Sequence, residues 1–108
     1  MHHNFLILKL IFVSNLIYAE FDLNNALTEF YSLDETKINI VIKDNIDIKN
    51  KVTTAGSLAL KDNIAAKNAF IIQKLIDSNF HISGKANLSE WANFRSENSV
   101  SGWSSIGG

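Results

Sequence analysis

Two stretches of this sequence carry residue types that could do chemistry. Lys43 comes directly after an apolar run and is followed by Asp44 and Asn45. Viewed alone, a lysine at the end of a strand is most often a solvated charge. Near the end of the sequence, Ser104-Ser105-Ile106-Gly107 could be taken for a nucleophile motif, but such a motif needs a strand, a turn and a following helix, and no helix follows here. Residue type alone therefore assigns no reaction.

The elements that would position Lys43 follow from the hydrophobic pattern. Alternating isoleucines predict a largely buried strand over 38–42. A second strand is expected over 80–82, ended by Gly84. Between them, the apolar spacing predicts a helix that begins at residue 62 or 63 and runs to 78, with Ile64, Ile71, Ile72, Leu75 and Ile76 on its buried side. A strand, a helix and a strand in this order indicate an α/β fold with a parallel pair and a right-handed crossover.

Two further helices and a loop are expected around this unit. The spacing of apolar residues over 20–31 predicts a packing helix. Asn87 can cap a short helix, since Glu90 follows at the spacing of a capping box. Thr53–Ser57 has the composition of a loop, in which Gly56 can adopt a backbone conformation closed to other residues.

Size and charge exclude several classes of protein. With 108 residues and 46% apolar content, the chain forms at most one small globular domain. Ten basic and eleven acidic residues are scattered and give a net charge of −1, so no basic stripe supports nucleic-acid binding. The absence of cysteine excludes disulfides and thiolate chemistry.

Residues 1–19 are predicted to be a signal peptide, which leaves 20–108 as the domain. Lys9 lies in a weakly positive start, an apolar run reaches Tyr18, and Ala19 offers a cleavage point before Glu20. The run is too short and too interrupted to predict a stable membrane span. The alternative is a buried first helix. Cleavage would make the protein an exported one, periplasmic or secreted; without cleavage we expect it in the cytoplasm.

Three blocks of the sequence, taken in order, resemble the amidase signature family. They are Ile42–Asp47, Thr53–Ser57 and Gly84–Ser96, and the resemblance covers about 38–108. It implies the N-terminal part of a mixed sheet with flanking helices, which is an incomplete domain of that family.

The resemblance also implies a chemistry. Such enzymes hydrolyse amides with two serines, one in a cis peptide and one as nucleophile, and a lysine that accepts the proton; here that lysine would be Lys43. A lysine acts as a base only when neutral, so its pKa must fall from about 10.4 to near 7, which takes about 4 kcal/mol of burial and hydrogen bonding. An acyl enzyme then forms and water hydrolyses it. No metal or cofactor is implied. The residues expected to support Lys43 are Asp44, Asn45, Thr54, Gly56 and Ser57.

The sequence also departs from the family. Both family serines are expected beyond Gly108, and Ser101, Ser104 and Ser105 do not match them. Lys37-Ile38-Asn39 stands where members commonly read Gly-Ile-Pro. We therefore expect an amidase-family fragment that carries the lysine, lacks both serines and is inactive alone. The alternatives are one half of a split amidase completed by a second polypeptide, and a small non-catalytic secreted binding protein.

Overall fold

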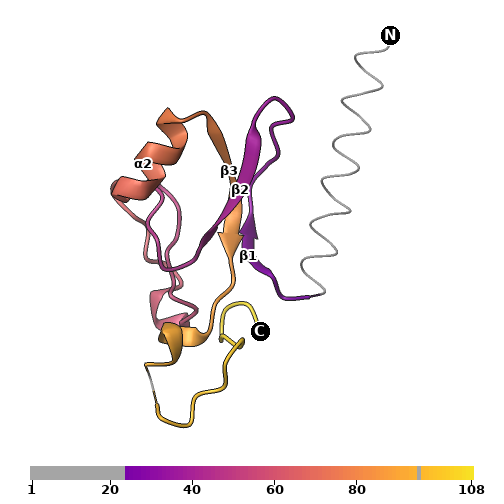
Figure 1. Ribbon diagram of the computed structural model, residues 1–108. Helices are drawn as coiled ribbons and strands as arrows, with labels where there is room; N and C mark the ends of the chain where they lie inside the picture. The colour runs from indigo at the N-terminus through magenta and orange to yellow at the C-terminus, as the bar shows by residue number, and fades with distance from the viewer. Residues whose placement is uncertain (1–23, 95) are drawn as a thin grey trace.

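The computed structural model describes residues 24–94 and 96–108 (Figure 1). Within these ranges the chain forms one mixed sheet, one α-helix and two 3₁₀ turns. In chain order the elements are β1 (Leu27–Phe30), β2 (Ile38–Lys43), a 3₁₀ turn (Leu58–Leu60), α2 (Phe70–Asp77), β3 (Phe80–Ala86) and a second 3₁₀ turn (Glu90–Asn93). The predicted signal peptide, residues 1–19, lies outside the described residues.

The sheet has the order β1-β3-β2, with β3 in the middle. β2 runs parallel to β3, and β1 runs antiparallel to it. The connection from β2 to β3 passes through α2, which lies to one side of the sheet (Figure 1). The predicted parallel pair with a helical connection is therefore confirmed, as is the mixed sheet that the family resemblance implied.

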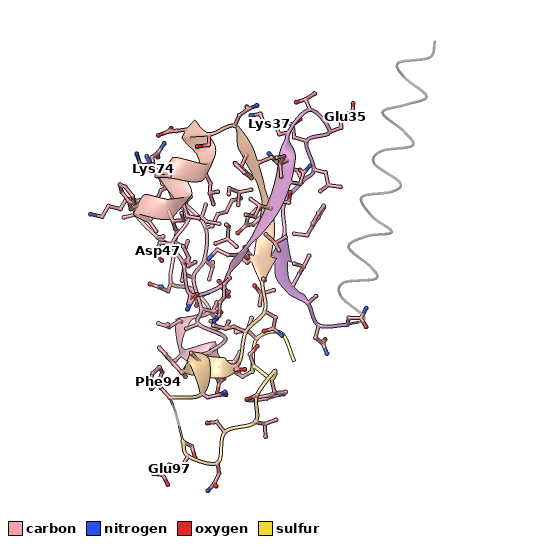
Figure 2. The ribbon with its side chains drawn as sticks, in the orientation of Figure 1. Glu35, Lys37, Asp47, Lys74, Phe94 and Glu97 are labelled. Carbon is pink, nitrogen blue, oxygen red and sulfur yellow. The ribbon has the colours of Figure 1, made fainter. Side chains whose placement is uncertain are left out.

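The apolar core lies between α2 and the sheet. Ile42, Ile48 and Ile72 form its buried centre, and Leu75 packs against them. Ile72 is fully buried because it faces the sheet, whereas Lys74 points away from it (Figure 2). One amphipathic helix is thus the main cover that the sheet receives from the described residues.

The prediction that Ile64, Ile71, Ile72, Leu75 and Ile76 lie together on the buried side of this helix is wrong. Ile64, which precedes α2, is 63% exposed, and Ile71 and Ile76 are 51% and 44% exposed. The prediction of a largely buried strand over 38–42 is also wrong, because this strand, β2, lies at the edge of the sheet. Ile38 and Val41 on it are 66% and 43% exposed. Only the side of β2 that carries Ile42 is closed by α2.

The helix predicted over 20–31 is wrong over its described part, where the chain forms β1. Leu27 and Phe30 pair with Ala86 and Gly84 of β3. Asn25 has a positive φ of 55° and ends any helical path just before the strand. Strand pairing across the sheet therefore outweighs an apolar spacing that also suited a helix.

The helix predicted from residue 62 or 63 begins only at Phe70. The segment before it runs antiparallel to the chain at 50–53. Asn50 and Thr53 donate their backbone N–H groups to Ala65 and Asn63 at 2.9 Å each. These bonds between two segments of the chain occupy peptide groups that would otherwise form the hydrogen bonds of a helix.

Gly84 does not end β3, contrary to the prediction. The strand continues to Ala86, and at Gly84 it passes very close to β1. A Cβ atom at this position would lie 2.3 Å from the backbone oxygen of Glu29. Glycine is therefore needed here for close strand packing, not for a turn.

The capped helix predicted after Asn87 is wrong. The chain forms only a 3₁₀ turn, in which Trp91 and Ala92 have positive φ values of 53° and 50°. Asn87 makes long-range contacts in place of a cap: its Nδ2 donates to the backbone oxygens of Asn25 and Gly108 at 2.9 Å. The Asn87 side chain, which was expected to cap the predicted helix, is thus engaged in tertiary contacts.

Candidate functional site

Lys43 is the last residue of β2, and its side chain is exposed. It lies opposite Ala86 in the parallel pairing, one step beyond the buried pair of Ile42 and Lys85. Successive residues of a strand point to opposite faces, so Lys43 points away from the side that α2 covers. Among the described residues its ammonium group makes no hydrogen bond or ion pair. We call this side of β2, which carries Val41 and Lys43, the open side.

Asp44 follows immediately and is buried, with 1% of its surface exposed. Its backbone N–H donates to the Ala86 carbonyl at 3.0 Å and extends the strand pairing by one bond. Its carboxylate accepts hydrogen bonds from the Thr54 hydroxyl and from the Lys85 ammonium, the latter at 3.0 Å. Asp44 therefore ties the end of β2 both to β3 and to the loop that follows.

Lys85 is the buried partner of this carboxylate. It is 0% exposed, and its ammonium donates to four oxygen atoms of the connecting loop. The distances are 3.0 Å to Asp44 Oδ1, 2.9 Å to the Ile46 carbonyl, 3.1 Å to the Val52 carbonyl and 3.2 Å to Thr53 Oγ1. A buried ammonium is tolerated only when it is paired and fully hydrogen-bonded, and this one is both.

The predicted supporting loop lies against Asp44. The Ala55 N–H donates to the Asp44 carbonyl at 2.8 Å, and the Gly56 N–H donates to Thr54 Oγ1 at 3.0 Å. Gly56 has a φ of +76°, and a Cβ there would lie 2.7 Å from the Ser104 side chain. Ser57 is buried and caps the following 3₁₀ turn through its side chain. Thr54, Gly56 and Ser57 are thus brought together with Asp44, whereas Asn45 is exposed.

The serines near the end of the chain pack against this loop. Ser104 is buried and donates to Asn87 Oδ1 at 2.7 Å. The single O–H of Ser105 is shared between the Glu90 carboxylate and the Gly56 carbonyl, which lies 3.1 Å from Ser105 Oγ. Ser101 Oγ accepts a hydrogen bond from Asn93 Nδ2 at 2.9 Å on the surface. None of these bonds involves Lys43: the Ser105 hydroxyl bonds to the loop at Gly56, and the Ser104 hydroxyl bonds to Asn87.

Two hollows lie beside the network, and neither includes Lys43. The smaller one, of about 100 Å³, is lined by Thr28, Glu29, Asp44, Val52, Thr54, Lys61 and Ile106. The larger one, of about 370 Å³, runs between β1 and the segment 50–52. Tyr31 borders it, and burial raises the pKa of the Tyr31 hydroxyl above its ordinary value, so this group stays neutral. Lys43, whose side chain is exposed, lines neither of these two hollows.

Lys85 is the residue that sequence reasoning missed. It falls inside the third family-like block, between Gly84 and Ala86, and no Asp, Glu, Arg or other Lys stands next to it in the sequence of β3. Small residues on both sides of a single lysine within a strand are the signal that could have indicated a buried position. The prediction that Gly84 ended the strand hid this signal.

A family model described as Amidase matches residues 24–103. The chain belongs to the amidase family. A probable amidase of Arabidopsis thaliana is 45% identical over 71 residues, which are 65% of this chain and 14% of that protein. A glutamyl-tRNA(Gln) amidotransferase subunit from Lawsonia intracellularis is 43% identical over 76 residues, which are 62% of this chain and 16% of that protein.

The fold agrees with this membership. The native peptide amidase of Stenotrophomonas maltophilia matches with a TM-score of 0.69 and 35% identity, over 78% of this chain and 21% of that enzyme. This amidase-family chain thus spans 12–16% of the length of the first curated relatives it matches. Its α/β unit corresponds to part of a larger amidase domain.

Two features are absent from the part of the chain that the structure describes. Over 24–94 and 96–108, no three histidine or acidic side chains gather closely enough to bind a metal ion. In the same ranges, no helix has both the length and the apolar character that crossing a bilayer requires.

Proposed function

We propose that this chain supplies the lysine-bearing part of an amide-hydrolysing site, with Lys43 as the proton acceptor. The observation that carries the proposal is the position of Lys43: it ends β2 within the family-like block and is followed directly by Asp44, which is buried and bonded to β3 and to the following loop. Two serines, provided by another amidase segment, would complete the site and attack an amide carbonyl.

The proposal includes inactivity of the isolated chain. A lysine accepts a proton only when neutral, and this requires burial that the open side does not provide. We expect the serine-bearing segment to cover the open side and bury Lys43. One relative is named as a subunit, which is compatible with an active site assembled from more than one chain.

The isolated 108-residue chain provides the first test. Incubation with simple aliphatic and aryl amides should release no ammonia. Release that disappears in Lys43→Ala would contradict inactivity of the isolated chain.

A chimera provides the decisive test. Residues 24–103 replace the matching segment of the peptide amidase of Stenotrophomonas maltophilia, and hydrolysis of a peptide amide is measured. General-base catalysis contributes about 10²–10⁴-fold, so Lys43→Ala should lower kcat by that factor. Lys49→Ala, which removes another exposed lysine nearby, is the matched control and should leave kcat unchanged. A folded chimera that is inactive, or equally active without Lys43, would refute the proposal.

A second amidase polypeptide is the partner we propose, and it can be tested directly. The serine-bearing remainder of the same peptide amidase is co-expressed with the chain, and the two are co-purified. Joint elution with amidase activity supports assembly from two chains, whereas separate elution contradicts it.

We further propose that residues 1–19 direct export and that 20–108 is the mature part. The apolar run before Ala19 supports this. Expression with a C-terminal tag, followed by N-terminal sequencing of the exported and cytoplasmic fractions, is the test. An exported product that begins at Glu20 is expected; a cytoplasmic product that begins at Met1 would contradict export.

A further inference from the structure

The loop between β2 and the first 3₁₀ turn has no regular secondary structure beyond one isolated bridge, so most of its peptide groups have no partners in a helix or a sheet. It runs over 44–57 and returns on itself, since the Ala55 N–H donates to the Asp44 carbonyl at 2.8 Å. Carbonyl groups buried in such a loop need donors, because an unpaired buried carbonyl is costly. For Ile46 and Val52 the donor is not another peptide group but the Lys85 ammonium.

Lys85 therefore acts on the loop much as a bound cation would. It contacts the loop at two separate points, the Ile46 and Val52 carbonyls, and also the Asp44 carboxylate directly after Lys43. An ammonium has three N–H groups, and here they serve four oxygens within 3.2 Å. The contact comes from a strand that lies 41 positions further along the chain than Asp44.

We propose that Lys85 is a positioning residue for Lys43. By holding Asp44 and these two points of the loop, it fixes the backbone direction at the end of β2 and so presents the Lys43 side chain on the open side. Lys85 itself points to the opposite side, in register with Ile42, so its proposed role is exerted through Asp44 and the loop. This inference rests on the proposed function of Lys43.

The test compares amide hydrogen exchange at the loop and in the helix of the 108-residue chain. The reporters are the N–H groups of Asp44 and Ala55, which bond to Ala86 and to Asp44, and the N–H of Gln73 in α2. In Lys85→Met we expect exchange of the two loop amides to accelerate at least tenfold, while Gln73 changes less than twofold. Equal acceleration everywhere, or none, would overturn the proposal. Lys67→Met, at an exposed position before α2, is the matched control and should change none of the three.

A second variant keeps the proposal testable if Lys85→Met does not fold. The double change Lys85→Met with Asp44→Asn removes both buried charges, a replacement that proteins often tolerate. If Lys85 served only to neutralise Asp44, protection of the Ala55 amide would return to the wild-type level. If Lys85 is a positioning residue, protection of the Ala55 amide stays low in the double variant, because the Ile46 and Val52 carbonyls still lack their donor.

The chimera with the peptide amidase separates positioning from general stability. A folded Lys85→Met chimera should show a kcat at least tenfold lower with KM unchanged within twofold. The reason is that Lys43 would be misplaced while substrate binding would be unaffected. Unchanged kcat would overturn the proposal even if Lys43→Ala is inactive. Conversely, loss of the proposed role of Lys43 would leave the loop measurements in the isolated chain unaffected, so the two failures are distinguishable.

Discussion

Two lysines on neighbouring strands lie on opposite sides of one sheet and have opposite environments. Lys85 of β3 is fully buried on the side covered by α2, where four oxygen atoms surround its ammonium. Lys43 of β2, one register step further on, is exposed on the open side. The same residue type is thus a fixed internal cation in one place and an exposed side chain in the other.

The difference teaches that burial by surrounding residues, and not residue type, decides what a lysine can do. Burial of an unpaired ammonium is strongly unfavourable, and Lys85 is accordingly buried with a carboxylate and three further acceptors around it. Lys43 has no such environment among the described residues. In our proposal the added amidase segment, with its serines, would complete the open side.

Asp44→Ala should produce the largest change, because it removes the carboxylate from the covered side and leaves the Lys85 ammonium buried and unpaired. Loss of one partner of a buried pair costs about 3–5 kcal/mol in free energy of unfolding. Urea denaturation followed by circular dichroism measures it. The control is Asp47→Ala, an exposed carboxylate, which should change stability by less than about 0.5 kcal/mol. Equal losses of stability in Asp44→Ala and Asp47→Ala would show that the buried Asp44–Lys85 pair contributes no more than an exposed carboxylate.

Ile72→Ala should have the next largest effect. Ile72 is 0% exposed, and its removal opens a cavity between α2 and the sheet that costs about 2–5 kcal/mol. Ile71→Ala, at a position that is 51% exposed, should cost less than about 1 kcal/mol. The same denaturation experiment measures both. A larger loss at Ile71 than at Ile72 would mean that the helix is rotated relative to the sheet.

Lys43→Ala should leave the stability of the isolated chain unchanged within about 0.5 kcal/mol, because an exposed side chain without partners contributes little. The thermal midpoint of the variant is compared with that of the unsubstituted chain. A clear loss of stability would show that Lys43 makes contacts on the open side and would remove the contrast with Lys85.

The smallest effect concerns the turn that leads from β1 into β2. The Thr36 hydroxyl and the Thr36 backbone N–H donate to Asp34 at 2.6 and 2.9 Å, and these bonds lower the pKa of the Asp34 carboxyl. A lowered folded-state pKa contributes stability above the unfolded pKa, and this contribution is lost as the pH falls through the folded pKa. In Thr36→Val the Asp34 midpoint, followed by NMR, should rise toward the ordinary aspartate value. An unchanged midpoint would contradict this.

Part of the fold and site could be predicted because it depends on local patterns. Alternating isoleucines indicated β2, and the order of elements indicated a parallel pair. The positive φ of Gly56 follows from a glycine in a tight loop. In contrast, the apolar spacing before residue 31 suits a helix as well as a strand, and only pairing with β3 selects β1.

By itself, the sequence determined the family blocks, the strand that carries Lys43 and the lack of any charge pattern for nucleic acid. Only the tertiary structure decided which lysine is buried. The register between β2 and β3 shifts after Ile40, so that Ile42 and not Lys43 lies opposite Lys85. Because side chains alternate between the faces of a strand, this register sends Lys85 inward to Asp44 and leaves Lys43 outside.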